Sequence, residues 1–364
     1  MTPTCVENGR LFSVGIFIRD GQCREPAIVA GMEGKGIRHK GIGTSWSRAA
    51  EMPDSPERLM PDLAYPPPRL GTLASMFKLA FSSIGCPDWT LRRVARAAVD
   101  SGFEGVELRT FGAGDGRLPS DPAWTDPAKI RNEVFVDDGV DIAALATSCR
   151  FDAPLGPPII GRALDDFEKE VREAKRQLDL AAAIGARFVR VFAFEPAPAE
   201  RPSKAIDRIA QRLELLCDHA RHRGVVVLLE NAGGYRRARD IACIIDRVGN
   251  PLLGASYSIA VGARAGDTPA EALNALGESL RLVRVQDYRG ATPCLPGDGE
   301  IPCQEFVERL AGNNADGWVV FEWPKLWAPK LAAPEDVLPV ANKTLSGWLY
   351  PQPSVKPCAV GASA

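Results

Sequence analysis

The sequence predicts a (β/α)₈ barrel, and three observations lead to this fold class. Short β-branched or apolar runs alternate with amphipathic helical stretches along most of the 364-residue chain. Eight such strand–helix pairs fit into about 275 residues, which is the size and rhythm of this barrel. The segment SSIGCPDW after the first strand has no GxGxxG fingerprint, and the chain has no GxxxxGK motif followed by Ser or Thr. An open doubly wound sheet and a nucleotide cofactor are therefore not expected.

Each predicted strand is an apolar run bounded by glycine or polar residues. In chain order, the predicted strands are 77–83, 104–110, 141–148, 186–194, 224–231, 252–258, 280–287 and 317–323. Helices are expected between them, and the first should begin at an Asp88 N-cap and stop at Gly102. The longest should end at Gly185, and a final helix over 334–349 should close the last unit.

The first 75 residues differ from the rest of the chain. They show no sustained helical or strand period and end in the breaker-rich stretch MPDSPERLMPDLAYPPPRLG. Residues 1–75 are therefore expected to be a disordered extension, or sequence upstream of the true start at Met76, and a small docking arm is the alternative. The barrel is expected over residues 76–350, followed by a disordered tail over 351–364.

Charge and hydropathy exclude several classes of protein. The 44 Lys and Arg residues nearly cancel the 46 Asp and Glu residues, whereas a nucleic-acid binder needs a basic surplus. No window approaches the roughly 18 unbroken apolar residues of a membrane span. The N-terminus lacks the basic start of a secretory signal, and the nine cysteines form no CxxC pair. We expect a cytoplasmic protein with reduced thiols and neither a membrane nor a nucleic-acid partner.

Two carboxylates end apolar strands at the predicted mouth of the barrel, where chemistry takes place in this fold. Glu230 ends the fifth strand and Glu322 ends the eighth, and alternation along each strand turns both inward, facing each other across the mouth. A rim ion pair explains either one alone, but the two together favour a binding pocket. Opposed carboxylates suit proton abstraction and return next to a carbonyl, through an enediolate. The negative oxygen of that intermediate needs a cation, either a divalent metal or a guanidinium.

Further polar side chains are expected at the same layer as candidate substrate contacts. They are Glu107, Arg109, Arg150, Arg190, Ser258, Gln286 and Lys325. The arginines would contact hydroxyl or phosphate groups, whereas Lys325 could bind an oxyanion or be a solvated rim charge. Cys86 and Cys149 are more commonly explained as small buried thiols than as nucleophiles.

With these motifs the sequence resembles the xylose isomerase-like TIM-barrel proteins, the sugar phosphate isomerase/epimerase superfamily, over about residues 76 to 350. The motifs are FSSIGCPDWTL, GFEGVELR, RFVRVF, VVLLEN, LVRVQDY, PGDGEIP and FEWPKLW. The resemblance implies a divalent metal, Mn or Mg, held by Glu, Asp, His and Glu on strands five to eight. Glu230 and Glu322 match the two glutamates, but the aspartate falls on Ser258 and the histidine on Arg284. Half of the implied metal shell is missing.

No histidine elsewhere can easily complete that shell. His39 lies in the extension, and His219 and His222 lie in the helix before the fifth strand. Arg284 is permanently cationic and disfavours a nearby divalent ion. Two readings stay open: Arg284 polarises a substrate carbonyl, or it locks both glutamates in a salt-bridge network and catalysis is lost.

The leading hypothesis is an isomerase or epimerase of a small sugar or sugar derivative, phosphorylated or not. Glu230 and Glu322 would be its acid–base pair, or its metal ligands if a metal is bound, and Arg284 its electrophile. The alternative is a catalytically silent sugar-binding barrel or a subunit of a larger complex. Lyase or hydrolase chemistry on a cyclic polyol or glycoside would use the same carboxylates. A homo-oligomer is compatible with the resemblance.

Overall fold

A computed structural model of the protein describes residues 77–110, 127–131, 135, 138–151, 166–196, 200–311 and 316–351. The predicted extension, residues 1–75, and all but the first residue of the predicted tail, residues 351–364, lie outside the described residues.

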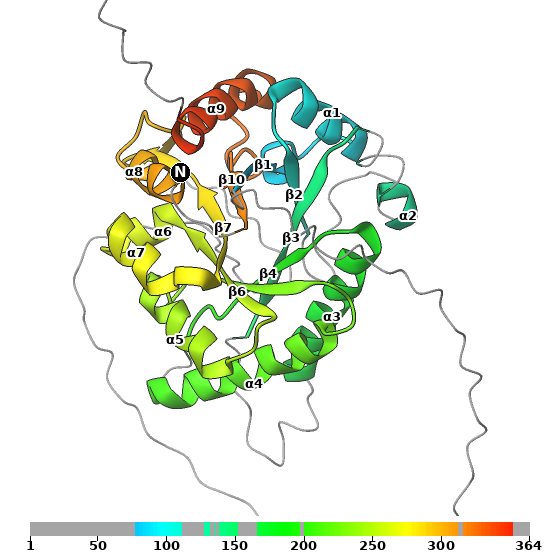
Figure 1. Cartoon of the computed structure of the whole chain (residues 1–364), viewed down its shortest axis with the longest axis vertical. Coiled ribbons are helices and arrows are strands. Elements are labelled where there is room, and N and C mark those ends of the chain that lie inside the picture. Colours follow the sequence, from blue (N-terminus) through cyan, green and yellow to red (C-terminus); the bar gives the residue numbers. More distant parts are fainter. Residues whose placement is uncertain are drawn as a thin grey trace, which may run out of the picture. The chain divides into compact units, whose positions relative to one another are not determined.

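Eight parallel strands form a closed barrel. They are β1 (Lys78–Ser82), β2 (Gly105–Arg109), β3 (Asp141–Arg150), β4 (Phe188–Phe192), β5 (Val226–Glu230), β6 (Leu253–Ser258), β7 (Leu280–Val285) and β10 (Trp318–Phe321). Their order around the barrel is β1-β10-β7-β6-β5-β4-β3-β2, and β2 pairs with β1 to close the ring (Figure 1). The predicted (β/α)₈ barrel is confirmed. All eight predicted strands are present, with ends that differ by at most two residues.

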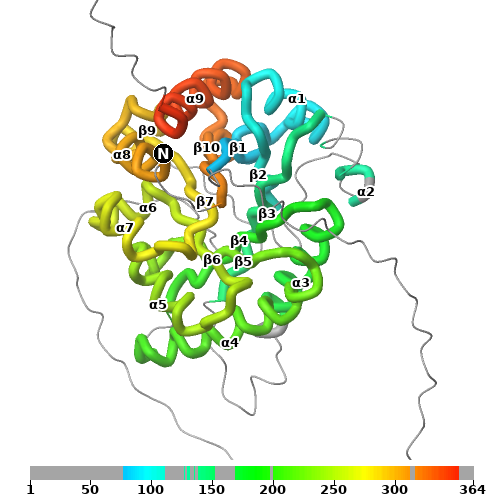
Figure 2. Tube along the Cα trace, in the orientation of Figure 1, coloured from blue at the N-terminus to red at the C-terminus, as the bar shows by residue number. Residues whose placement is uncertain are grey.

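Helices surround the strands, and the trace in Figure 2 shows them outside the ring of β-structure. They are α1 (Leu91–Ser101), α2 (Pro127–Lys129), α3 (Asp166–Ile184), α4 (Pro202–Ala220), α5 (Ala238–Val248), α6 (Ile259–Arg264), α7 (Pro269–Leu276), α8 (Cys303–Leu310) and α9 (Pro334–Leu349). The last of these has the predicted bounds. Gly185 follows α3 with a positive φ of 81°, as expected for a residue that stops a helix.

The start of α1 differs from its prediction, whereas its end agrees. Thr90, not Asp88, is the N-cap: its side chain accepts a hydrogen bond from the backbone N–H of Arg93. Both residue types cap helices, but only Thr90 directly precedes the first helical residue, which places its hydroxyl within reach of that amide. Gly102 ends the helix with a φ of 79°.

The interior of the barrel is filled by side chains of graded size. Ala80, Ala143 and Ala144 leave room for the larger inward residues Phe188 and Trp318, and all five are buried. Gly105 is required beside this layer because a Cβ atom there would lie 2.7 Å from the Trp318 ring. The barrel is therefore a packed core beneath its mouth rather than a pore.

A two-stranded hairpin that was not predicted follows β7. Its strands, β8 (Asp287–Arg289) and β9 (Thr292–Cys294), are antiparallel, and Gly290 turns between them with a φ of 59°. The hairpin leads into α8 and stands at the same end of the barrel as the C-termini of the parallel strands.

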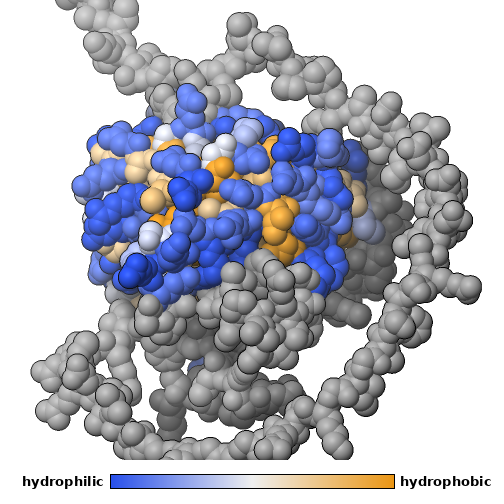
Figure 3. Space-filling view, turned by 90° about the horizontal axis from the view of Figure 1, so that it is seen from below, coloured by the Kyte–Doolittle hydropathy of each residue, from blue (hydrophilic) through white to orange (hydrophobic). Residues whose placement is uncertain are grey.

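The face of the molecule seen in Figure 3 is largely hydrophilic, with hydrophobic residues in small scattered groups. Among the helices that the structure describes, none combines the length and the apolar character needed to cross a bilayer.

Candidate functional site

Strand register brings the predicted polar residues to one level at the mouth of the barrel. Glu230 on β5 pairs with Ser256 on β6, and Ser258 on β6 pairs with Arg284 on β7. Arg284 in turn pairs with Val320 on β10, two residues before Glu322. Four neighbouring strands thus carry polar side chains where each strand ends, above the apolar residues that fill the barrel.

Arg284 lies at the centre of this site and is only 3% exposed. Its Nη2 and Nη1 atoms donate to the two oxygens of Glu107 at 2.6 and 2.8 Å. Its Nε and Nη2 atoms donate to Oε2 of Glu230 at 3.2 and 3.1 Å, and Nη1 also donates to Glu322. The five guanidinium N–H groups are therefore all engaged by three carboxylates. Glu230 and Glu322 do not simply face each other, because they share this arginine.

Further side chains donate hydrogen bonds to the carboxylates of Glu230 and Glu322. Arg190 on β4 donates to Oε1 of Glu230 at 3.2 Å, and the Ser256 hydroxyl donates to Oε2 at 2.8 Å. The Gln286 amide donates to Oε1 of Glu322 at 2.6 Å. Arg190 and Gln286 were predicted to be substrate contacts at the mouth, whereas Ser256 was not among the candidate contacts although alternation turns it inward. The alternation that selected Ser258 is the signal that could have identified Ser256 two residues earlier.

Burial and charge shift the pKa values of Glu230 and Glu107 in opposite directions. Burial favours protonation of Glu230, but Arg190 and Arg284 outweigh it and hold the pKa of this carboxyl at about 2. The pKa of Glu107 is likewise lowered, because Arg284 outweighs its burial. Burial lowers the pKa of Arg109 to about 10, with repulsion from Arg190 adding to the effect. Glu107 and Glu230 are therefore ionised at neutral pH.

Several buried polar atoms at this end of the barrel have no hydrogen-bond partner among the described residues. They are Nε and Nη2 of Arg190 and the hydroxyls of Ser82 and Ser258. The Arg190 guanidinium also lies 4.3 Å from the centre of the Phe192 ring. A buried polar atom without a partner is costly, so these atoms identify positions where a bound polar molecule or water would be stabilised.

Arg150, another candidate substrate contact, packs against the segment that follows β4. The Arg150 guanidinium lies 5.1 Å from the centre of the Phe194 ring, just after β4. Phe194 has a φ of 65°, which is unusual for a residue with a Cβ atom. Its carbonyl accepts a hydrogen bond from Gly234 N–H at 2.8 Å, which ties the loops after β4 and β5 together.

Lys325 contacts its own loop. Its ammonium group donates to the carbonyls of Leu331 at 2.6 Å and Pro329 at 3.2 Å. Trp323 donates its indole N–H to Ala332 O at 3.1 Å in the same segment. Lys325 therefore stabilises the loop after β10, and within the described part of the chain its hydrogen bonds go to carbonyls of that loop rather than to the carboxylate cluster.

The residues at the mouth do not fit a divalent metal. The Arg284 guanidinium occupies the space between Glu230 and Glu322, and Ser258 stands where the resemblance implies an aspartate. Within the described ranges, no group of three or more His, Cys, Asp and Glu side chains is arranged to hold a metal ion. A positive charge that already bonds the carboxylates competes directly with an ion for the same oxygens.

The remaining candidates lie apart from this chemistry. His219 contacts Asp179 at 2.9 Å between α4 and α3, and His39 lies outside the described residues. Burial raises the pKa of the Cys86 thiol and raises that of Cys149 to about 12, so neither is a thiolate at neutral pH.

Asp287 organises the loop that follows the site, a role that was not predicted from the sequence. Its carboxylate accepts hydrogen bonds from the backbone N–H groups of Tyr288, Gly297, Gly299 and Ile301, at 2.8, 2.9, 3.0 and 3.1 Å. The clue in the sequence is the glycine-rich stretch PGDGEIP, whose amides need a common acceptor. This carboxylate gives the loop after β7 a defined shape.

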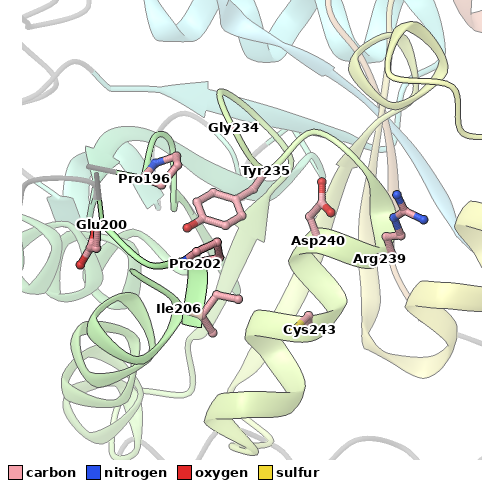
Figure 4. Close-up of a pocket in the computed structure, with 9 residues that line it drawn as sticks. All are labelled: Pro196, Glu200, Pro202, Ile206, Gly234, Tyr235, Arg239, Asp240 and Cys243. Carbon is pink, nitrogen blue, oxygen red and sulfur yellow. The ribbon is translucent and has the colours of Figure 1, made fainter. Parts of the chain in front are cut away.

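A hollow of about 470 Å³ lies between the loops that follow β4 and β5, at the beginnings of α4 and α5. Figure 4 shows the Tyr235 ring within it, with Ile206 on one side and Asp240 on the other. It shares no lining residue with the carboxylate cluster.

A closed (β/α)₈ barrel with a buried polar cluster at its C-terminal strand ends has the layout of a TIM-barrel active or binding site. The family model described as "Xylose isomerase-like TIM barrel" matches residues 95–340. The chain belongs to this family.

Individual relatives add detail. Fructoselysine 3-epimerase from Escherichia coli O157:H7 is 24% identical over 155 residues, which is 41% of this chain and 56% of the relative. The chain thus matches about half the length of this curated relative, and the same holds for the Shigella flexneri protein of that name.

Solved structures share the fold. An IOLI protein with a bound zinc atom has a TM-score of 0.62 and 17% identity, covering 75% of this chain and 98% of its own. An L-ribulose 3-epimerase has a TM-score of 0.61 and 15% identity, covering 75% and 95%. A probable 3-DHS dehydratase from Bacillus anthracis has a TM-score of 0.60 and 17% identity, covering 74% and 99%. At these identities the likeness is one of fold.

Proposed function

We propose that the protein is an isomerase or epimerase of a sugar or sugar derivative. Its relatives include proteins named fructoselysine 3-epimerase and L-ribulose 3-epimerase, which supports this class of reaction. The observation that carries the proposal is Glu322 beside Arg284 at the mouth of the barrel. This pair combines a carboxylate that can move a proton with a fixed positive charge next to it.

Glu322 is the proton-transfer group in this proposal. Its side chain is 13% exposed, against 0% for Glu107 and 7% for Glu230. In the proposed step Glu322 leaves Arg284 and takes the proton from a substrate carbon next to a carbonyl, and the electron pair of the broken C–H bond moves to the carbonyl oxygen. The N–H group that Glu322 releases then donates to the substrate oxygen, where the negative charge of the enediolate develops.

Glu107 and Glu230 serve to hold Arg284 in place. A carboxylate with a pKa of about 2 is a weak base at neutral pH, so Glu230 is assigned to positioning rather than to the acid–base role that the sequence suggested. One base returns the proton on the face from which it took it. The proposal therefore favours proton transfer between neighbouring carbons over inversion at a single carbon.

The other residues near the mouth remain proposed substrate contacts. They are Arg109, Arg150, Arg190, Ser258 and Gln286. Of these, Arg190 and Ser258 carry the buried polar atoms without partners that a hydroxyl or phosphate oxygen of the substrate would satisfy.

A sugar-binding barrel without catalysis is the second candidate function. The observation that favours it is the complete engagement of Arg284, which leaves no N–H group free for a substrate unless a carboxylate moves. In this case the salt-bridge network fixes the shape of the mouth and ligand binding is the whole activity.

Exchange of carbon-bound protons with deuterated solvent tests the proposal. The full chain is incubated with a panel of aldoses, ketoses and inositols in D₂O, and proton loss is followed by NMR. We expect exchange that falls by about 10²- to 10⁴-fold in Glu322→Gln, the usual contribution of a general base. Glu308→Gln on α8 is a matched surface control and should exchange at the wild-type rate.

Each outcome separates the candidates. Full exchange in Glu322→Gln would contradict the assignment of the base. Saturable binding of a sugar by calorimetry, with no exchange or turnover, would establish the silent barrel instead.

A further inference from the structure

The four strand-end positions at 230, 258, 284 and 322 form one contiguous half of the barrel mouth. They lie on β5, β6, β7 and β10, which are successive neighbours in the barrel. Register places Ser258 directly beside Arg284 and Ser256 beside Glu230. The side chains in this half of the mouth therefore converge on the same small volume, which the Arg284 guanidinium fills.

This half of the mouth has two features of a cation-binding site. Glu230 and Glu322 are held by outer partners, Ser256 and Gln286, which fix the direction of their oxygens. The Ser258 hydroxyl is buried and has no partner among the described residues, although it stands next to the cation. A longer acidic side chain at this position would reach toward the same centre.

The Arg284 guanidinium balances the negative charges of three carboxylates. Two buried carboxylates, Glu107 and Glu230, and the partly buried Glu322 bond to Arg284. Without this arginine, Glu107 and Glu322 would lose the guanidinium to which they bond. An uncompensated buried carboxylate is strongly unfavourable, so the cluster requires a cation at this point.

We propose that Arg284 is a permanent, covalently attached cation in the place of a divalent metal ion, and that the residues at 258 and 284 decide between the two. The protein as it stands holds no divalent metal at the mouth. Replacing Ser258 by Asp and Arg284 by His would supply an acidic and an imidazole ligand to the existing glutamates, a donor set that suits Mn²⁺ or Zn²⁺. This inference does not rest on the proposed isomerase activity, because its readout is metal binding.

Calorimetry and metal analysis of the full, untagged chain test it. Wild type should retain no stoichiometric Mn²⁺ or Zn²⁺ after dialysis and should give no saturable heat. The folded double variant Ser258→Asp/Arg284→His should bind one ion per chain, at least about 100-fold more tightly than wild type. The single variant Ser258→Asp keeps the guanidinium and should not bind.

A third substitution locates the ion. Adding Glu322→Gln to the double variant should weaken binding at least about tenfold, which distinguishes the mouth from a surface site at His219 and His222.

Two results would overturn the proposal. One is a wild-type protein that binds one ion per chain and loses it on Glu230→Gln or Glu322→Gln. The other is a double variant that folds, as shown by circular dichroism, and binds no metal. The wild-type measurement alone decides the question if the double variant does not fold. Failure of the sugar-exchange experiment would leave these metal measurements unaffected.

Discussion

Replacing Glu230 by glutamine removes a buried negative charge that two arginines hold. The pKa of this carboxyl is about 2, against an ordinary value of 4.5. At about 1.4 kcal/mol per pKa unit, the ionised form contributes roughly 3 kcal/mol to the free energy of unfolding. Because the folded pKa is the lower one, this contribution is complete above pH 4.5 and is lost as the pH falls toward 2. Glu230→Gln should therefore be much less stable than wild type at pH 7, and the difference should shrink in acid.

Urea unfolding followed by tryptophan fluorescence measures this effect. The difference in free energy of unfolding between wild type and Glu230→Gln should narrow by about 2 kcal/mol between pH 6 and pH 3. The exposed ion pair of Glu305 with Arg309 on α8 supplies a control, since Glu305→Gln should cost less than about 1 kcal/mol. A difference for Glu230→Gln that stays constant from pH 6 to pH 3 would refute the conclusion that Arg190 and Arg284 hold this group ionised.

Three further predictions concern the loops and a helix. Asp287→Ala should leave several backbone amides of the loop after β7 without their acceptor, which lowers the free energy of unfolding by about 2–4 kcal/mol. Limited proteolysis of this loop should become faster, and an unchanged rate of cleavage would contradict the role of Asp287 in shaping the loop. Gly299→Ala should lower the free energy of unfolding by about 2 kcal/mol or more, because the new Cβ would lie 2.1 Å from Asp287 Oδ1. Gly347→Ala in α9 meets nothing within 4 Å and should raise it by about 0.5–1 kcal/mol. Thermal unfolding compares the two variants directly, and equal shifts of their unfolding temperatures would be inconsistent with this geometry. Lys325→Met should lower stability by about 1 kcal/mol and leave sugar affinity unchanged in calorimetry, and a large loss of affinity at wild-type stability would instead make Lys325 a substrate contact.

The strands of the barrel could be predicted because each is a short apolar run between breakers. The run from Val226 to Glu230, for example, is buried on both sides, as parallel barrel strands are. Local choices were less predictable. Asp88 and Thr90 are both good caps, and only the backbone conformation at Thr90 distinguishes them. The β8–β9 hairpin is too short to show a period of its own.

Alternation and strand order placed Glu107, Arg190, Glu230, Arg284, Gln286 and Glu322 at the mouth, and in the structure these side chains contact one another, whereas Lys325 bonds its own loop. The pairing itself could not be predicted. Glu107 and Arg284 are separated by 177 residues, and nothing local to either one shows that they bond. Whether the guanidinium leaves a donor free depends on the positions of three carboxylates from different strands. That information exists only in the packed structure, and it is the reason why our proposal assigns Glu230 to positioning, whereas the sequence suggested an acid–base role.

Gln286 and Asp287 are adjacent in the chain but serve opposite sides of the strand end. Gln286 donates a hydrogen bond to Glu322 at the mouth, whereas Asp287 accepts hydrogen bonds from four backbone amides between residues 288 and 301 in the loop that follows. A single peptide unit thus joins the residue that shapes the outer loop to the residue that orients Glu322, the proposed proton-transfer group. Transplanting this loop between family members to alter specificity would have to carry both residues together, because a graft that disturbs either one would misalign the other.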